Sequence, residues 1–285
     1  MAAISRRMFL LGGTATLLPY LYLEGFSVAV RRYLAPVSNL PSAFEGFTVL
    51  QLSDLHDKEF GKRGADLLEI ISRLSFDLVA LTGDMVVGES PSLAPLLDLV
   101  AGMRRFSDTP VYSVCGNHEW ALLRAPEFDT RLSEAGVRVL SNSCAVIRRG
   151  KERLWIAGVD DPVTLRDRLD LALKDTDKGA PRLLLAHSPH PYPQAIKAGI
   201  DLMLTGHTHG GQVRFPLVGA AFVPAMGFFP RWDYGLYSSG PTTMIVNGGL
   251  GESMYPVRFN IRPEVVLVTL VSHPGAPPAP GDAAR

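Results

Sequence analysis

The chain has 285 residues, enough for one large hydrophobic core or two small ones. Its 28 basic and 28 acidic side chains give a formal net charge of zero. This balance provides no overall electrostatic attraction to nucleic acid, and it argues against a nuclease, which would need a basic groove with stacking aromatic residues. Of the two cysteines, Cys115 lies in an apolar run and is expected in the core. The spacing of Cys115 and Cys144 gives no support for a disulfide.

The N-terminal segment carries an arginine pair ahead of an apolar stretch. Arg6 and Arg7 precede Met8-Phe-Leu, and the apolar run continues to Leu23, which resembles a twin-arginine export signal. The run is shorter than the roughly 20 residues of a membrane-spanning helix, and Pro19 interrupts it. We therefore expect residues 1–25 to form a signal that stays attached as a short anchor. Such a protein would lie on the outer face of the cytoplasmic membrane, in the periplasm or in the cell wall. The alternative is a basic flank before a buried helix.

The next part of the chain alternates strand-like apolar runs with amphipathic helical runs. A first strand is expected from Phe26 to Leu34, followed by a turn marked by Pro36 and Pro41. Further strands are expected over residues 47–52, 78–84 and 111–119, each run ending in polar residues. Two helices are expected between them, over residues 65–74 and from a cap at Ser90 or Ser92 through residue 105.

The second half of the chain continues this alternation. Helices are expected over residues 127–135 and 164–174, and strands over residues 137–140, 144–147, 154–158, 182–187 and 201–204. Residues 243–247 and 265–271 are expected to close a second sheet. We expect one catalytic domain over residues 26–272. The candidate ligands described below are spread from Asp54 to His209, so a domain boundary between them would divide the site. Residues 273–285 are expected to be a disordered tail, since proline, alanine and glycine dominate there.

Ligand-type side chains follow five of the apolar runs, at the point where each run ends. The segments are Asp54-Leu-His56, Gly83-Asp84, Gly116-Asn117-His118-Glu119, His187 and Gly206-His207-Thr-His209. In α/β folds the carboxyl ends of the strands meet at one edge, where sites are built. This placement favours a metal centre over a set of loops with solvated histidines.

These five motifs, in this order, resemble the calcineurin-like metallophosphoesterases, and the resemblance extends from about Phe44 to Val271. It implies an α/β fold: a four-layer αββα sandwich of two mixed β-sheets, with a dinuclear metal site at the edge formed by the carboxyl ends of the strands. By position, the first ion would take Asp54, His56 and His209, and the second would take Asn117, His187 and His207. Asp84 would bridge both ions. His118 would not bind metal; it would face the phosphate and assist the leaving group.

The ligand types indicate the chemistry. Oxygen and imidazole donors without thiolate suit Mn, Fe or Zn better than Cu(I) or an iron–sulfur cluster. Two such ions about 3.5–4 Å apart hold a hydroxide and the phosphate oxygens together, so we predict a metallophosphoesterase. A phosphomonoester, a phosphodiester and a pyrophosphate all remain open as the substrate. The alternative is a non-catalytic metal-binding scaffold on the same fold, but such relatives typically lose ligands or the catalytic histidine, and this chain retains them all.

Three acidic residues near the motifs have simpler interpretations than catalysis. Asp57 follows His56, where many members of the family carry a small or apolar residue. It either adjusts the charge of the site or caps the following loop, and the cap is the simpler interpretation. Asp160 and Asp161, in Gly-Val-Asp-Asp-Pro, are assigned to turn structure.

A long apolar segment from Val213 to Trp232, broken by prolines, follows the last motif directly. We expect it to form an irregular wall beside the site. Packing of its phenylalanines on the sheet is the simpler interpretation. The alternative is an apolar rim that receives the acyl or isoprenoid part of a lipid-linked phosphate, with Arg214 or Arg231 near its headgroup. Together with an N-terminal anchor, this alternative predicts membrane association and a lipid-linked phosphoester substrate. The sequence indicates no oligomeric state.

Overall fold

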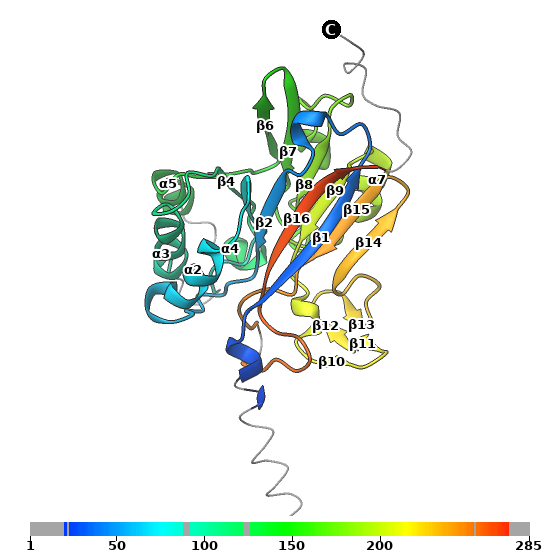
Figure 1. Ribbon diagram of the computed structural model, residues 1–285. Coiled ribbons are helices and arrows are strands. Elements are labelled where there is room, and N and C mark those ends of the chain that lie inside the picture. Colours follow the sequence, from blue (N-terminus) through cyan, green and yellow to red (C-terminus); the bar gives the residue numbers. More distant parts are fainter. Residues whose placement is uncertain (1–19, 22, 88–91, 122–125, 254, 274–285) are drawn as a thin grey trace, which may run out of the picture.

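The computed structural model describes residues 20, 21, 23–87, 92–121, 126–253 and 255–273. In this part of the chain two six-stranded sheets pack face to face, and helices cover the outer face of each (Figure 1). The predicted four-layer αββα sandwich is confirmed. None of the helices in these ranges is both long and apolar enough to cross a membrane.

The first sheet has the strand order β1-β16-β2-β3-β4-β5. Strands β2 to β5 run parallel, whereas β16 is antiparallel to β2 and parallel to β1. Because both faces of this sheet are covered, its central strands are apolar on both sides, as the continuous runs at β2 and β3 predict. The strands are β1 (Ala29–Val37), β2 (Thr48–Leu52), β3 (Leu78–Leu81), β4 (Val111–Ser113), β5 (Val137–Val139) and β16 (Glu264–Ser272).

The second sheet has the strand order β14-β15-β9-β8-β7-β6. Its four central strands are parallel, and antiparallel hairpins add β6 and β14 as its edges. The β6–β7 hairpin carries basic residues on both sides of Gly150. The strands are β6 (Ser143–Arg149), β7 (Glu152–Gly158), β8 (Arg182–Leu185), β9 (Leu202–Thr205), β14 (Gly235–Ser239) and β15 (Thr242–Val246).

Three helices cover the first sheet and two cover the second, so each sheet has a buried outer face. Leu67 and Ile71 of α2 lie four residues apart and are both buried against the first sheet, as predicted for an amphipathic helix. Helices α2, α3 and α5 lie on one side of the molecule and α7 on the other (Figure 1). The helices are α2 (Ala65–Ser72), α3 (Ala94–Met103), α4 (Asn117–Ala121), α5 (Pro126–Glu134), α6 (Leu169–Ala172) and α7 (Tyr192–Ala198), with 3-10 turns at Ser42–Phe44, Lys62–Gly64 and His209–Gly211.

The central core lies between the two sheets. Residues alternate along β2: Val49 faces this core, whereas Leu50 and Leu52 face the helices. Gln51 is also buried, and its amide nitrogen donates to Thr82 Oγ1 at 3.1 Å and to the Thr205 carbonyl at 3.0 Å. Since Thr82 and Thr205 come from different sheets, this amide ties the two sheets together beside the ends of β2, β3 and β9.

Three predictions of local structure were wrong in part. Strand β16 closes the first sheet rather than the second, because it pairs with β1 and β2. The expected helix over residues 164–174 forms only at α6; Asp161 instead caps a turn through the amides of Val163 and Thr164, and Leu165 has a positive φ of 58°. The first strand begins three residues later than expected, after a helical segment at residues 20–26, of which residue 22 is outside the described residues.

Other expectations are settled or remain outside the described residues. Neither Cys115 nor Cys144 forms a disulfide. Residues 1–19, which contain the arginine pair, and residues 274–285 of the expected tail lie outside the described ranges.

The segment after the last motif lies beside the site, as expected, and contains two small hairpins that contact the turn at His209–Gly211. They are formed by β10 (Arg214–Phe215) with β11 (Gly219–Ala220), and by β12 (Phe222–Val223) with β13 (Gly227–Phe228). Both hairpins lie at the same end of the molecule as the N-terminal helical segment (Figure 1). The prediction that their phenylalanines pack on the sheet was wrong. The strands have two residues each, and the hairpins leave these side chains exposed to solvent. The exposed phenylalanines are Phe215, Phe222, Phe228 and Phe229.

Candidate metal centre

The predicted ligands come from both sheets and meet at one edge of the sandwich. Each lies just after the carboxyl end of a strand, because the parallel strands of the two sheets end at this edge. Asp54 and His56 follow β2, Asp84 follows β3, Asn117 and His118 follow β4, His187 follows β8, and His207 and His209 follow β9. Three groups of their ligand atoms lie within 4.8 Å of one another: Asp54 with His56 and His209, His56 with Asp84 and His118, and Asp84 with His187 and His207.

One set of donors contains Asp54, His56 and His209. The Nε2 atoms of His56 and His209 lie 3.0 Å apart. Asp54 Oδ1 is 3.5 Å from His209 Nε2 and 4.0 Å from His56 Nε2. All three side chains are almost completely buried, so they converge on one small polar space.

A second set contains Asn117, His187 and His207. His187 Nε2 lies 3.2 Å from both Asn117 Oδ1 and His207 Nδ1. Asp84 lies between the two sets, since its Oδ2 is 3.1 Å from His187 Nε2 and 3.9 Å from His56 Nε2. Its other oxygen accepts the backbone N–H of His118 at 2.8 Å, which fixes the orientation of the carboxylate.

His118 differs from the other histidines of the site because its side chain is 25% exposed. Its Nε2 lies 3.9 Å from Asp84 Oδ2, and its ring meets the His56 ring edge-on with the centroids 4.7 Å apart. Its Nδ1 atom has no hydrogen-bond partner within the described ranges. His118 therefore stands at the open side of the cluster, where a substrate can reach it.

Backbone carbonyls orient two of the buried imidazoles. His187 Nδ1 lies 2.9 Å from the Thr82 carbonyl, and His209 Nδ1 lies 3.1 Å from the Gly251 carbonyl. A carbonyl can only accept, so Nδ1 carries a proton in both rings and Nε2 is the nitrogen left to face the centre. This is the tautomer that a metal ligand needs.

The backbone at the site is held in an unfavourable conformation. Asp54, His56, Asp84, His207 and His209 all have positive φ angles, between 49° and 68°. Non-glycine residues rarely adopt this region, and such conformations persist only where the surrounding structure enforces them, typically at functional sites. Here the amides on either side are fixed by hydrogen bonds, for example from His207 N to both carboxylate oxygens of Asp54 at 3.1 and 3.0 Å.

The glycines of two motifs are needed for close packing. A Cβ on Gly116 would lie 2.2 Å from Asp84 Oδ1, and a Cβ on Gly206 would lie 1.9 Å from Ser53 Oγ and 2.3 Å from Asp54 Oδ2. Side chains at these positions would therefore displace the two carboxylates of the centre.

Burial determines the protonation of the cluster. It lowers the pKa of His56 to about 4 and that of His207 to about 3, and it lowers the pKa of His209 well below its usual value, so these rings are neutral near pH 7. Burial also acts on Asp84, but the positive charge of protonated His187 outweighs it and lowers the pKa of Asp84. Burial lowers the pKa of His187, but the Asp84 carboxylate outweighs it and raises that pKa to about 10. For Asp54, burial raises the pKa to about 7, with the Asp84 charge acting in the same direction.

These observations fit divalent metal ions. Neutral imidazoles have lone pairs directed at the same spaces as two buried carboxylates, a combination that is costly without a cation and favourable with one. The His56 and His209 nitrogens that face each other at 3.0 Å can share at most one proton, which is also typical of two ligands to one ion. Oxygen and nitrogen donors without sulfur suit Mn, Fe or Zn.

Glu119 belongs to the Asn-His-Glu motif, but the sequence alone indicated no role for it. Its buried carboxylate accepts the backbone N–H groups of Met85, Gly116 and Asp84, at 2.7, 2.7 and 2.9 Å. It thereby fastens the loop that bears Asp84 to the loop that bears Asn117. Its position directly after Asn117 and His118 was the sequence signal that could have indicated a role at the site.

Arg258 was missed entirely. It is completely buried, and its guanidinium donates to the carbonyls of Gly248, Gly249 and Gly251, with 2.9 and 3.2 Å to the first two. Gly251 is the residue whose carbonyl orients His209. The arginine therefore holds the glycine-rich loop that fixes a candidate ligand. No spacing in the sequence connects it to the motifs.

The acidic residues near the motifs have structural roles. Asp57 Oδ2 accepts hydrogen bonds from the backbone N–H groups of Val87 and Ser92, at 3.2 and 3.4 Å. Asp57 therefore caps the loop after β3, and not the loop directly after Asp57 that the sequence suggested. Asp160 accepts hydrogen bonds from the side chains of Ser141 and Asn142, and Asp161 caps its own turn. The assignment of these two residues to turn structure is confirmed.

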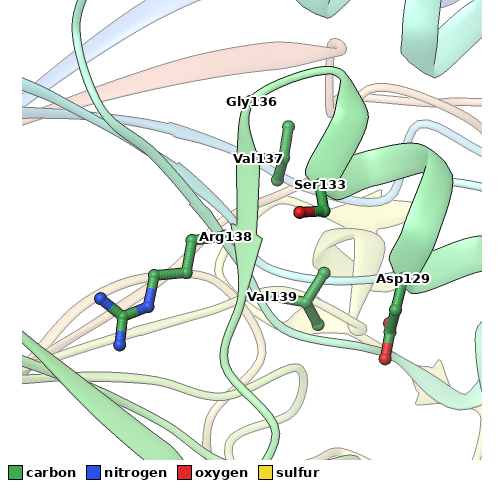
Figure 2. Close-up of a pocket in the computed structure, with 6 residues that line it drawn as sticks. All are labelled: Asp129, Ser133, Gly136, Val137, Arg138 and Val139. Carbon is green, nitrogen blue, oxygen red and sulfur yellow. The ribbon is translucent and has the colours of Figure 1, made fainter.

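Hollows lie both away from the ligand cluster and beside it. One, of about 480 Å³, lies beside α5 and β5, where Figure 2 shows Arg138 on the opposite side of the strand from Asp129 and Ser133. These polar groups do not converge, and none of the predicted ligands lines the hollow. Another, which we call the apolar cleft, also measures about 480 Å³ and borders the centre at His209. It is lined by Thr208, His209, Gly211, Gln212, Val213, Phe222, Pro224, Tyr255 and Val257.

A four-layer sandwich with such a cluster at the carboxyl edge of its strands defines a metal-dependent hydrolase of phosphoester bonds. The family model described as calcineurin-like phosphoesterase matches residues 47–211, and the chain belongs to this family. The family resemblance predicted from the motifs is confirmed.

Relatives cover almost the whole chain. The phosphodiesterase YaeI of Escherichia coli is 31% identical over 94% of this chain and 100% of its own length. The uncharacterized metallophosphoesterase YkuE of Bacillus subtilis is 28% identical over 95% of this chain and 99% of its own length. Among solved structures, TT1561 of Thermus thermophilus is 16% identical, with a TM-score of 0.44 over 72% of this chain and 90% of its own.

Proposed function

We propose that the protein hydrolyses a phosphoester with two divalent metal ions, one held by Asp54, His56 and His209 and the other by Asn117, His187 and His207. The observation that carries this proposal is the position of Asp84, whose Oδ2 faces His187 at 3.1 Å and His56 at 3.9 Å. A carboxylate between two sets of ligands can bind an ion from each. Mn, Fe or Zn would suit these donors.

Bound divalent ions supply an activated water and neutralise the charge that develops on the phosphoryl group. The residues of this chain supply the rest. His118, exposed beside Asp84, donates a proton or a hydrogen bond to the leaving oxygen. The carbonyls that bind His187 and His209 keep the ligand tautomers fixed, and Glu119 holds the loop of Asp84 in place.

The relation to a phosphodiesterase favours a diester among the three candidate substrate types. A non-catalytic scaffold on the same fold is the competing function. A metal-binding scaffold would need the ligands and the bonds that orient them, but it would not need an exposed His118 beside Asp84. The exposure of His118 therefore favours the enzyme.

We further propose that the substrate is lipid-linked, with its apolar part in the apolar cleft. The cleft begins at the candidate ligand His209 and continues past Val213, Phe222 and Val257. Apolar walls beside a polar reaction centre are what a molecule with a phosphate head and a hydrocarbon tail requires. Its volume of about 480 Å³ lies in the range of small-molecule sites.

Phe222→Ser tests the lipid-linked substrate with two phosphodiesters that share a leaving group, one short-chain and one long-chain. We expect KM for the long-chain ester to rise about ten- to a hundredfold, because a phenylalanine contact of about 1.5–3 kcal/mol is lost, and KM for the short one to change less than about twofold. The matched control is Phe106→Ser, which is exposed to a similar degree (42%, against 45% for Phe222) but does not line the cleft. Equal changes in KM for both esters would contradict the proposal.

We also propose that the protein is exported by the twin-arginine route and stays at the outer face of the membrane. The support is the Arg6-Arg7 pair before an apolar run. Arg6→Lys with Arg7→Lys should leave the protein in the cytoplasmic fraction with its hydrolytic activity unchanged. Fractionation with an immunoblot measures this, and normal export of the double variant would refute the signal.

A further inference from the structure

Large apolar side chains are exposed at one end of the molecule. The hairpin surface is defined here by five exposed side chains of the two small hairpins. Phe215, Leu217 and Val218 lie at the turn of the first hairpin, and Phe228 and Phe229 lie at and just after the end of β13, away from the turn of the second. Leu217 is fully exposed, and Phe228 and Phe229 are 76% and 65% exposed. Single exposed apolar residues are ordinary on a soluble protein, but five large ones on two consecutive short hairpins indicate a contact with something apolar.

The backbone at this surface argues in the same direction. Leu217 and Phe229 have positive φ angles of 67° and 48°. Glycine or asparagine is favoured at positive φ angles, and a large apolar residue gains nothing there from the folded chain itself. The hairpin surface thus presents leucine and phenylalanine where the backbone favours other residues.

The N-terminal segment joins the domain beside these hairpins. The Tyr20 ring packs edge-on against Phe259 with the centroids 5.9 Å apart, and its hydroxyl lies 3.3 Å from Asn260 Oδ1. Asn260 in turn donates to the carbonyl of Arg214 in β10 at 3.1 Å. Residues 1–19, with their apolar run from Met8, therefore connect to the chain next to the hairpin surface. Leu23 and Phe26 of the helical segment are exposed as well.

The charge of this region suits an anionic surface. Residues 213–232 contain Arg214 and Arg231 and no acidic residue. Arg214 is paired with Asp233 at 2.8 Å, whereas Arg231 is exposed and packs over the Trp232 ring, 5.3 Å from its centroid. Exposed apolar tips beside arginine and tryptophan are the composition of a segment that enters the headgroup region of a membrane.

We propose that the hairpin surface docks on a lipid bilayer, with Leu217, Phe228 and Phe229 inserted among the acyl chains. The hairpins and the N-terminal segment then approach the membrane together, since they lie at the same end of the molecule (Figure 1). Phe222 of β12 lines the apolar cleft and packs on Phe228 of the hairpin surface, with ring centroids 5.1 Å apart. Docking therefore places the mouth of the cleft at the bilayer. The docking itself does not depend on which phosphoester is hydrolysed.

Depth-dependent fluorescence quenching of the full-length protein tests this proposal. A dye is attached at Leu217→Cys, or as a control at Lys151→Cys in the exposed β6–β7 turn, both with Cys144→Ser; Cys115 is buried. The β6–β7 turn lies at the opposite end of the molecule from the hairpins (Figure 1). Vesicles of phosphatidylcholine and phosphatidylglycerol carry nitroxide on their acyl chains. We expect strong quenching at position 217, and at least about threefold weaker quenching at position 151.

A second variant separates docking from simple tethering. Phe228→Ser with Phe229→Ser, in the protein labelled at position 217, should reduce the quenching severalfold while hydrolysis of a soluble phosphoester is unchanged. No quenching at position 217 of vesicle-bound protein would overturn the proposal, and so would a failure to bind vesicles. Self-association in vesicle-free buffer that the two serines abolish would assign the surface to a second copy of the chain instead. If the protein labelled at position 217, with Phe228 and Phe229 intact, does not hydrolyse a soluble phosphoester, this result counts against the proposed function and not against docking.

Discussion

His118→Ala is expected to lower kcat by about 10²–10⁴ while both metal ions remain bound, because a positioned proton donor contributes on this order to catalysis. The side chain lies at the open side of the cluster, 3.9 Å from Asp84 Oδ2, and its exposure distinguishes it from the buried histidines among the candidate ligands. It can therefore act on the leaving oxygen without holding an ion. Metal analysis and kcat on the same preparation measure both parts of this expectation.

Substrates with different leaving groups sharpen the test of His118. If it protonates the leaving oxygen, a phosphoester whose leaving group needs no proton should recover most of the lost rate in the alanine variant. The matched control is His273→Ala, an exposed histidine after β16, which should retain full activity. A variant that lacks one metal ion would instead make His118 a ligand.

Asp84→Asn is expected to reduce the occupancy of both metal positions, because Asp84 faces both ligand sets. Asparagine retains an oxygen that can accept the His118 N–H, so the loop should keep its fold, but the negative charge is lost. We expect metal affinity at both positions to fall at least about a hundredfold, since indirect partners of metal ligands already contribute up to that amount. Activity should fall in parallel. Titration of the metal-free variant with Mn²⁺ or Zn²⁺ measures the affinities.

Asp57→Asn provides the matched control for Asp84. Asp57 follows His56 directly, but its carboxylate caps the loop after β3 through the amides of Val87 and Ser92. This variant should bind two ions with nearly unchanged affinity. Full occupancy of both positions in Asp84→Asn would show that Asp84 does not bridge, whereas metal loss in Asp57→Asn would give Asp57 a role at the site.

The strand ends that carry the site were predicted from the sequence more accurately than the other parts of the fold. Apolar runs that end in ligand-type residues are local signals, and parallel strands bring their carboxyl ends together, so Asp54, Asp84 and His187 could be expected at one edge before the fold was known. Which of the two sheets contains β16 could not be deduced in this way. An apolar strand near the C-terminus can join either sheet, and only pairing with β1 and β2 decides.

The supporting residues were hidden for a different reason. Arg258 acts on the backbone carbonyls of Gly248, Gly249 and Gly251, and no side-chain pattern reports such contacts. The phenylalanines of the hairpins were misplaced because their composition alone favours a core. Their exposure follows from the shortness of β10 to β13, which tertiary structure determines.

Metal reconstitution of the wild-type protein tests the central claim most directly. The protein is stripped with a chelator, titrated with Mn²⁺ or Zn²⁺, and assayed for phosphodiester hydrolysis with the bound metal counted on the same samples. Two ligand sets joined by Asp84 predict that hydrolysis is lost in the stripped protein and returns in full only as the second ion per chain binds. Hydrolysis that persists without metal, or that is complete with a single ion bound, would contradict the two-metal centre.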